Sequence, residues 1–170
     1  MTITDRISVD FLLIDWGTSS FRAWAVASDG RVAAERRSSE GMKFCTKDDF
    51  PRVLAAHIAA MQVPEEVPLM ICGMVGAREG WREAGYLPVP ALLSDIVAAA
   101  VPVRFHGRNL RILPGLCQTA GAPNVMRGEE TQLLGVAADG EGVACLPGTH
   151  SKWVRVRSGK IETFKTFMTG

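Results

Sequence analysis

The first residues able to do chemistry stand where an apolar segment meets a small, hydroxyl-rich turn. Residues 11–14 are apolar, Asp15 follows, and the turn holds Gly17, Thr18, Ser19 and Ser20. A glycine lets backbone amides approach an anion, hydroxyls add donors, and a strand-end carboxylate can bind Mg²⁺ through its waters. We therefore expect a phosphate-binding turn with Asp15 as metal ligand and Arg22 as a cation for phosphate or a carboxylate. A plain hairpin with Arg22 at its surface is the alternative.

The chain repeats this layout near its end. Residues 143–146 are apolar, and the residues that follow include Gly148, Thr149, His150, Ser151 and Lys152. Each copy continues into a second strand and a turn, formed by residues 29–30 in the first copy and 158–159 in the second. Such an internal repeat predicts two hairpin loops that bind one set of phosphates. Two unrelated hairpins with similar turns are the alternative.

The second copy lacks the acid of the first, because Leu146 stands where Asp15 stands. We expect Gly148 and Thr149 to donate to phosphate, and His150 and Lys152 to stabilise developing charge. A structural role for Lys152 is the alternative, since alternation along a strand would place it on one face with Val154.

The spacing of apolar residues predicts the elements that position these groups. Residues 10–15, 21–28 and 31–38 are expected to be strands that open an antiparallel sheet, with a turn at Asp29-Gly30. Thr46 and Asp49 resemble a capping box before a helix, and residues 67–72 resemble a buried parallel strand. Further elements are expected at 92–100 (helix), 110–113 (strand) and 129–138 (helix), with a domain boundary near 138–142.

Composition excludes several classes of protein. The chain has 170 residues, enough for one core, and its formal charge of +1 gives no global attraction to nucleic acid or to an anionic membrane. Its four cysteines have no Cys-x-x-Cys spacing, which favours reduced core thiols over disulfides or zinc. No apolar segment is long enough for a membrane span or a signal peptide, so we expect a cytoplasmic protein.

Six segments, in the same order, resemble those of the 2-dehydro-3-deoxygalactonokinase family, of the actin-like ATPase and sugar-kinase superfamily. They are Asp-Trp-Gly-Thr at 15–18, Cys-Gly-Met-Val-Gly at 72–76, Tyr-Leu-Pro-Val-Pro at 86–90, Leu-Pro-Gly-Leu-Cys at 113–117, Asn-Val-Met-Arg-Gly-Glu-Glu-Thr-Gln-Leu-Leu-Gly at 124–135, and Pro-Gly-Thr-His-Ser-Lys-Trp-Val at 147–154. The resemblance implies an α/β actin-like (ribonuclease H-like) domain with a mixed sheet and β-β-β-α-β-α order over 1–138. Residues 139–170 would then supply the first hairpin strands of a second, similar domain.

The same resemblance implies an activity. Members phosphorylate 2-dehydro-3-deoxy-D-galactonate at its 6-hydroxyl with ATP and Mg²⁺, and their two domains close to exclude water. Members are about twice as long, so we expect this chain alone to bind ATP weakly. Alternatives are a phosphohydrolase such as an exopolyphosphatase, or a sugar-acid-binding fragment without catalysis. Exposed hairpin edges make pairing of two copies into a homodimer a further expectation.

The resemblance also assigns roles to two other segments. Exopolyphosphatases carry a Gly-Glu-Glu block like that at 128–130, so Glu129, or otherwise Glu130, is expected to act as general base. Acids that only favour a helix start are the alternative. A sugar acid is expected to contact a glycine-containing segment at the carboxyl end of a strand, where open α/β sheets bind ligands. The expected substrate-binding residues are Gly73, Met74, Val75, Gly76, Arg78, Trp81, Arg127 and Gly128.

Overall fold

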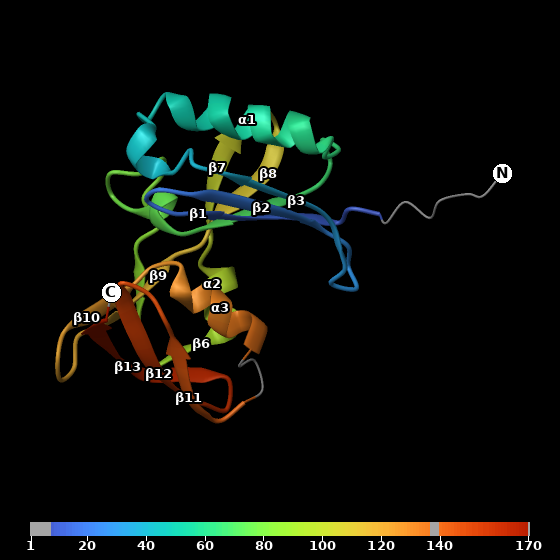
Figure 1. Ribbon diagram of the computed structural model, residues 1–170. Helices are drawn as coiled ribbons and strands as arrows, with labels where there is room; N and C mark the ends of the chain where they lie inside the picture. Colours follow the sequence, from blue (N-terminus) through green and yellow to red (C-terminus); the bar gives the residue numbers. More distant parts are fainter. Residues whose placement is uncertain (1–7, 137–139, 170) are drawn as a thin grey trace. The chain divides into compact units, whose positions relative to one another are not determined.

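The computed structural model describes residues 8–136 and 140–169 and separates them into two compact units (Figure 1). The first unit combines Met1–Glu83 with Pro102–Ile112, and the second combines Ala84–Val101 with Leu113–Gly170. The first unit has one sheet and the second has two, and each unit has its own buried apolar residues.

A six-stranded mixed sheet forms the first unit, in the order β3-β2-β1-β4-β8-β7. β1 pairs antiparallel with β2 and parallel with β4, and β4 pairs parallel with β8. The elements are β1 (Phe11–Trp16), β2 (Phe21–Val26), β3 (Val32–Ser38), η1 (Met42–Phe44), α1 (Asp49–Met61), β4 (Leu69–Cys72), η2 (Met74–Gly76), β7 (Val101–Phe105) and β8 (Arg108–Ile112).

One face of this sheet is covered by α1 (Figure 1). Side chains of a strand alternate between its faces, and in β1 the buried ones are Leu12, Ile14 and Trp16. Helix α1 buries Phe50 and Leu54 fully. His57 of α1 is also buried, and its ring stacks on Phe21 with centroids 4.1 Å apart.

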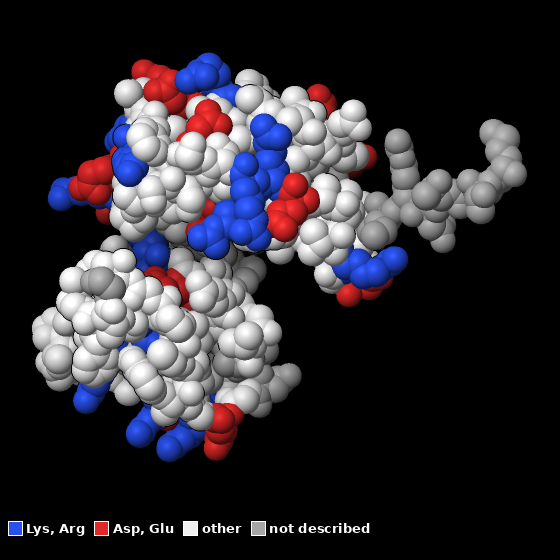
Figure 2. All heavy atoms as spheres, in the orientation of Figure 1, with Lys and Arg blue, Asp and Glu red and all other residues white. Residues whose placement is uncertain are grey.

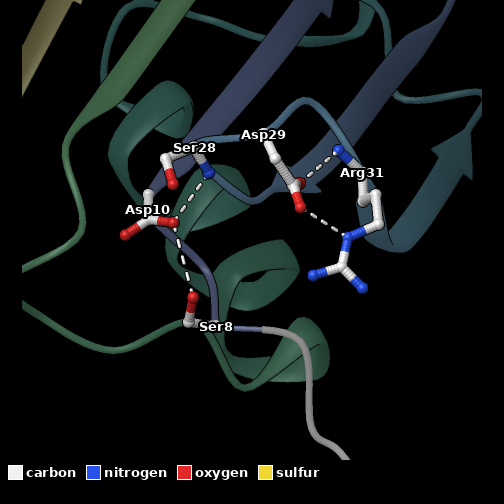
Figure 3. Close-up of polar contacts among 5 residues, drawn as sticks. All are labelled: Ser8, Asp10, Ser28, Asp29 and Arg31. Atoms are coloured by element: carbon white, nitrogen blue, oxygen red, sulfur yellow. Dashed lines mark hydrogen bonds and ion pairs between the residues drawn. The ribbon is translucent and has the colours of Figure 1, made fainter.

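Side-chain hydrogen bonds fix the turn between β2 and β3 (Figure 3). Gly30 has φ +85°, which glycine adopts at little cost, and Asp29 accepts from the Arg31 backbone N–H at 3.0 Å and from Nε at 2.7 Å. Asp10, just before β1, accepts from the Ser28 N–H at 2.8 Å. The predicted Asp29-Gly30 hairpin turn is therefore confirmed.

The second unit contains two small sheets. Strands β10-β9-β5 form one, and β11-β12-β13-β6 form the other, in which every pairing is antiparallel. Its buried apolar side chains include Val154, Ile161 and Phe164 of the second sheet. The elements are β5 (Tyr86–Pro88), β6 (Ala91–Leu92), α2 (Leu93–Ala98), β9 (Gly115–Gln118), β10 (Asn124–Met126), α3 (Glu129–Val136), β11 (Gly142–Leu146), β12 (His150–Arg157) and β13 (Lys160–Met168).

The structure confirms an α/β fold with a mixed sheet that opens antiparallel and then adds a parallel strand after a helix. The strands at 86–88, 91–92, 101–105, 115–118 and 124–126 were not expected. The division at residue 138 stays a prediction, and residues 137–139 lie outside the described residues. Contacts within this chain place residues from both sides of that position in the second unit, because β6 pairs with β13.

The expectation of core thiols holds fully for one of the four cysteines, Cys72, which is buried. None of the four forms a disulfide; Cys45 and Cys117 are half-buried, and Cys145 is exposed because it pairs with Trp153 on the outward face of β11 and β12. No described helix has the length and apolar character needed to cross a membrane.

Candidate functional site

Asp15 lies near the carboxyl end of β1, opposite Arg22 of β2 on one side and Cys72 of β4 on the other. Its Oδ2 is 4.0 Å from Arg22 Nε, and its side chain keeps 34% exposure. Burial raises the pKa of this carboxyl, and the Arg22 charge opposes that shift. A partly buried carboxylate that still reaches solvent can receive a cation.

Gly73 gives the Asp15 carboxylate its room. This glycine has φ +90°, and a Cβ there would lie 2.8 Å from Trp16 O and 3.1 Å from Asp15 Oδ1. A side chain at this position would therefore displace the carboxylate as well as strain the backbone.

A tight turn follows Asp15 and Trp16. Gly17 N–H donates to Ser20 O at 2.9 Å, and Thr18 and Ser19 are exposed at its tip. In unit 1 the structure thus brings together the acid, the hydroxyl-bearing turn and Arg22, as the sequence predicts, in a geometry suited to a hydrated cation beside an anion.

These residues fit Mg²⁺, which proteins usually bind through one or two carboxylates together with substrate phosphates. Asp15 would hold the metal, and no group of three or more His, Cys, Asp or Glu gathers among the described residues. Dedicated protein ligands of the kind that bind zinc are thus absent from the part of the chain that the structure describes.

The segment after β4 contributes backbone more than side chains. Gly73 precedes η2, where the Val75 side chain is fully buried and only Met74 is half-exposed. Trp81 packs parallel to Phe50, with centroids 6.1 Å apart, so this indole belongs to an aromatic cluster of unit 1. Gly76 is buried, and Arg78 is exposed and available to an anion.

In the second unit, α3 begins with the two glutamates. Both oxygens of Glu130 lie 2.8 Å from the Gly128 N–H, and the residue is fully buried. Burial raises the pKa of Glu130 to about 7, although the backbone hydrogen bonds oppose the shift. Glu129 is half-exposed and accepts from the Arg127 N–H at 3.1 Å. Of these two glutamates, only Glu129 keeps exposure to solvent.

Arg127 is already engaged within the second unit. Its guanidinium lies 4.3 Å above the Tyr86 ring, and Nη2 donates to Gly85 O at 2.7 Å. Its Nη1 is buried without a hydrogen-bond partner among the described residues. These contacts fix the arginine next to the start of α3.

The second turn resembles the first in its strand connections. It links antiparallel β11 and β12, as the first links β1 and β2, and Gly148, Thr149 and His150 are exposed. Its carbonyl at Gly148 accepts from Ser151 Oγ at 3.2 Å and from Thr169 Oγ1 at 3.0 Å. Sequence reasoning missed Thr169, which no motif marked.

Lys152 is buried rather than directed to solvent. Its Nζ donates to Val125 O at 2.9 Å and to Thr166 Oγ1 at 2.8 Å, while Trp153 points outward and Val154 inward. These contacts favour the structural alternative for this lysine. In the repeated layout, Lys152 follows Ser151 as Phe21 follows Ser20. Both side chains are buried, so Lys152 occupies the inward position of its strand that Phe21 occupies in the first copy.

Comparison with known proteins finds similar sequences over nearly the whole chain. The family model described as 2-keto-3-deoxy-galactonokinase matches residues 15–170. A Rhizobium meliloti protein named "Probable 2-dehydro-3-deoxygalactonokinase" is 52% identical over 94% of this chain. The Escherichia coli protein named 2-dehydro-3-deoxygalactonokinase is 40% identical over 94% of it.

A solved structure is similar over the same range. The crystal structure of a Sinorhizobium meliloti protein provisionally named 2-dehydro-3-deoxygalactonokinase has 52% identity and a TM-score of 0.87, over 93% of this chain and 54% of that one. The chain likewise spans about half the length, 54%, of each curated relative. Because the family model matches nearly the whole sequence, the chain belongs to the 2-keto-3-deoxy-galactonokinase family.

Proposed function

We propose that this chain supplies part of an ATP-dependent kinase that phosphorylates 2-dehydro-3-deoxy-D-galactonate at its 6-hydroxyl, in the cytoplasm. The family match and the names of the two relatives support this activity. The observation that carries it is the Asp15 carboxylate beside the exposed turn at residues 17–20. The proposal includes the actin-like form of the α/β fold, with 139–170 as the start of a second domain.

Phosphoryl transfer requires charge neutralisation and a proton acceptor. Mg²⁺, held through Asp15, would neutralise phosphate charge and polarise the transferred group. Thr18, Ser19 and Ser20 donate to phosphate oxygens in the first turn, and Gly148, Thr149 and His150 do so in the second. Arg22 pairs with a phosphate.

The sugar acid is proposed to contact the backbone at Gly73, Met74 and Gly76, with Arg78 pairing with its carboxylate. The 6-hydroxyl oxygen then forms a bond to the γ-phosphorus, the bond to the ADP oxygen breaks, and the hydroxyl proton passes to Glu129. Glu130, buried with both oxygens at the Gly128 amide, positions the start of α3.

A mass-spectrometric assay tests the proposal. The chain is mixed with ATP, Mg²⁺ and 2-dehydro-3-deoxygalactonate, alone and joined to the part of the Rhizobium meliloti relative that lies outside the matched region. We expect the joined protein to form a phosphorylated sugar acid and the chain alone to form little.

Matched variants assign the residues. Asp15→Asn and Glu129→Gln are expected to lower the rate at least about 100-fold, and the exposed Glu79→Gln to leave it unchanged. Phosphate release without sugar phosphate would favour the phosphohydrolase alternative. Sugar-acid binding without any transfer would favour a binding fragment.

A further inference from the structure

The turn at residues 17–20 is packed against a second segment that the site description leaves without a role. The Met42 N–H donates to Gly17 O at 2.9 Å, and the Lys43 N–H donates to Thr18 O at 3.0 Å. Both donors belong to η1, which begins directly after Gly41 and is joined to β3 by residues 39–41. Two successive carbonyls of the turn therefore accept hydrogen bonds from one short element.

These hydrogen bonds determine where the amides of the turn point. In a trans peptide the C=O and the following N–H are coplanar and point in opposite directions. Because the Gly17 and Thr18 carbonyls face η1, the Thr18 and Ser19 N–H groups face away from it. Among the described residues, neither N–H donates a hydrogen bond to another group of the chain. Successive free amides of this kind form an anion-binding concavity.

Gly41 allows η1 to come this close. Its φ of −72° and ψ of 170° are ordinary for any residue, so its backbone conformation does not require glycine. A Cβ on Gly41, however, would overlap the backbone of Ser19 and Ser20. The glycine is needed for space between two backbones.

The segment that precedes η1 is held in place by a buried side chain of the core. Trp16, the residue before the turn, donates from Nε1 to Glu40 O at 2.9 Å. Its ring is fully buried and makes edge contacts with Phe21 and Phe50, at centroid distances of 5.0 and 5.2 Å. The segment before η1 therefore has little freedom to move away from the turn.

We propose that Gly41 and the backbone amides of Met42 and Lys43 are positioning groups that hold the Thr18 and Ser19 amides in their anion-binding orientation. The ligand class is a phosphate or polyphosphate anion, and the inference rests on the proposed function of this turn. These groups act through the turn and need no contact with the ligand.

Two substitutions test this proposal by different means. Gly41→Ala adds a methyl group that must displace the turn, and Gly135→Ala, a glycine in α3 with open space around it, is its control. Met42→Pro removes one N–H, at a position where proline is tolerated because it opens a helix and follows an extended residue. Its effect is measured relative to Met42→Ala, which keeps the N–H.

The readout is amide NMR of the 170-residue chain during titration with inorganic pyrophosphate and, separately, MgATP. We expect the Thr18 and Ser19 amide signals to shift on titration in the unsubstituted chain. Gly41→Ala, and Met42→Pro relative to Met42→Ala, are expected to weaken binding at least about fivefold, the effect of one lost hydrogen bond. Spectra without ligand verify that each variant retains the signals of the sheet.

The proposal is overturned if both variants bind as tightly as their controls, or if neither amide shifts in the unsubstituted chain. Should Gly41→Ala lose its folded spectrum, Met42→Pro decides the result alone. The kinase proposal is judged separately, by sugar phosphate formed by the joined protein, so either proposal can fail without the other.

Discussion

Glu130 is the residue whose ionisation should affect stability most visibly. Its pKa is raised from 4.5 to about 7 because the carboxyl is buried. Below the unfolded-state value, both states are protonated and ionisation costs nothing. As pH rises from about 4.5 through 7, the unfolded chain loses its proton first, so the native state loses stability and then levels off.

Glu130→Gln should remove this pH dependence. The difference in unfolding free energy between the variant and the unsubstituted chain should change in favour of the variant as pH rises. From about pH 4.5 to pH 8 we expect this change to be on the order of 3 kcal/mol. Denaturant unfolding at both pH values measures the gain. Glu162→Gln on β13 is the control for a lost acid, and an equal gain there would contradict the assignment to Glu130.

The chemistry-bearing residues were predictable where their role follows from backbone geometry. A carboxylate at a strand end before Gly17 was placed correctly in the fold from the local sequence. For Lys152 the sequence left two alternatives, and the structural one, which places it on one strand face with Val154, fits the inward side chain that donates to Val125 O. Gly41 carried no recognisable motif, since its neighbours in space lie in another turn.

At the scale of elements, α1 and β3 share a buried polar contact. Arg36 Nε of β3 donates to His57 Nδ1 of α1 at 2.6 Å, and His57 Nε2 lies 3.1 Å from Glu40 Oε2. Burial lowers the pKa of His57, Glu40 opposes that shift and Arg36 adds to it. The contact requires an unprotonated Nδ1, so the neutral ring is the form that fits the native state.

His57 should therefore make the attachment of α1 sensitive to acid. As pH falls through the unfolded histidine pKa of about 6.5, the unfolded chain takes up the proton first and the native state loses stability. His57→Gln keeps a neutral acceptor for Arg36. We expect its unfolding free energy to fall less than that of the unsubstituted chain between about pH 8 and pH 5.

Acid lowers native stability through His57, whereas rising pH lowers it through Glu130. Because the two pH effects oppose each other in the unsubstituted chain, only the single variants measure each one separately. His106→Gln, at an exposed position, is the control for a changed histidine count. An unchanged acid dependence in His57→Gln, measured by denaturant unfolding followed by circular dichroism, would show that the α1 contact does not carry the effect.

Long periodic elements could be predicted from sequence, and short ones could not. Apolar periodicity located α1 and β1 to within a few residues, because each buries one face over several residues. Strands β5, β6 and β10 have two or three residues each, too few for a period to emerge. They exist because neighbouring strands are present to pair with them.

At the scale of the whole molecule, charge is distributed unevenly between regions. On the visible face of the first unit, Lys and Arg side chains lie beside Asp and Glu (Figure 2). One ion pair of this unit joins Arg37 Nε and Glu35 Oε1 at 2.6 Å. The part of Figure 2 that corresponds to β11–β13 shows few charged atoms across its middle. The exposed apolar side chains of β11 and β12 include Val143 and Trp153.

Among the described residues, strand β11 is the outer strand of its sheet, and within this 170-residue chain it has the features of an edge that pairs. It pairs with β12 in a continuous register over residues 142–146, without the irregularity found between β12 and β13. Natural edges commonly carry charges or bulges that prevent pairing, and β11 has no Lys, Arg, Asp or Glu. We propose that two copies of the 170-residue chain, taken on its own, pair through β11 to form a homodimer.

Val143→Lys tests this pairing by adding one charge to the edge. Sedimentation equilibrium at several concentrations should show association of the unsubstituted chain, and about a tenfold weaker association of the variant, because a desolvated ammonium opposes strand addition. Val97→Lys, at an exposed position of α2, adds the same charge elsewhere and should associate as the unsubstituted chain does. An unsubstituted chain that stays monomeric at every concentration contradicts the proposal, as does equal weakening by both substitutions, which would attribute association to net charge rather than to β11.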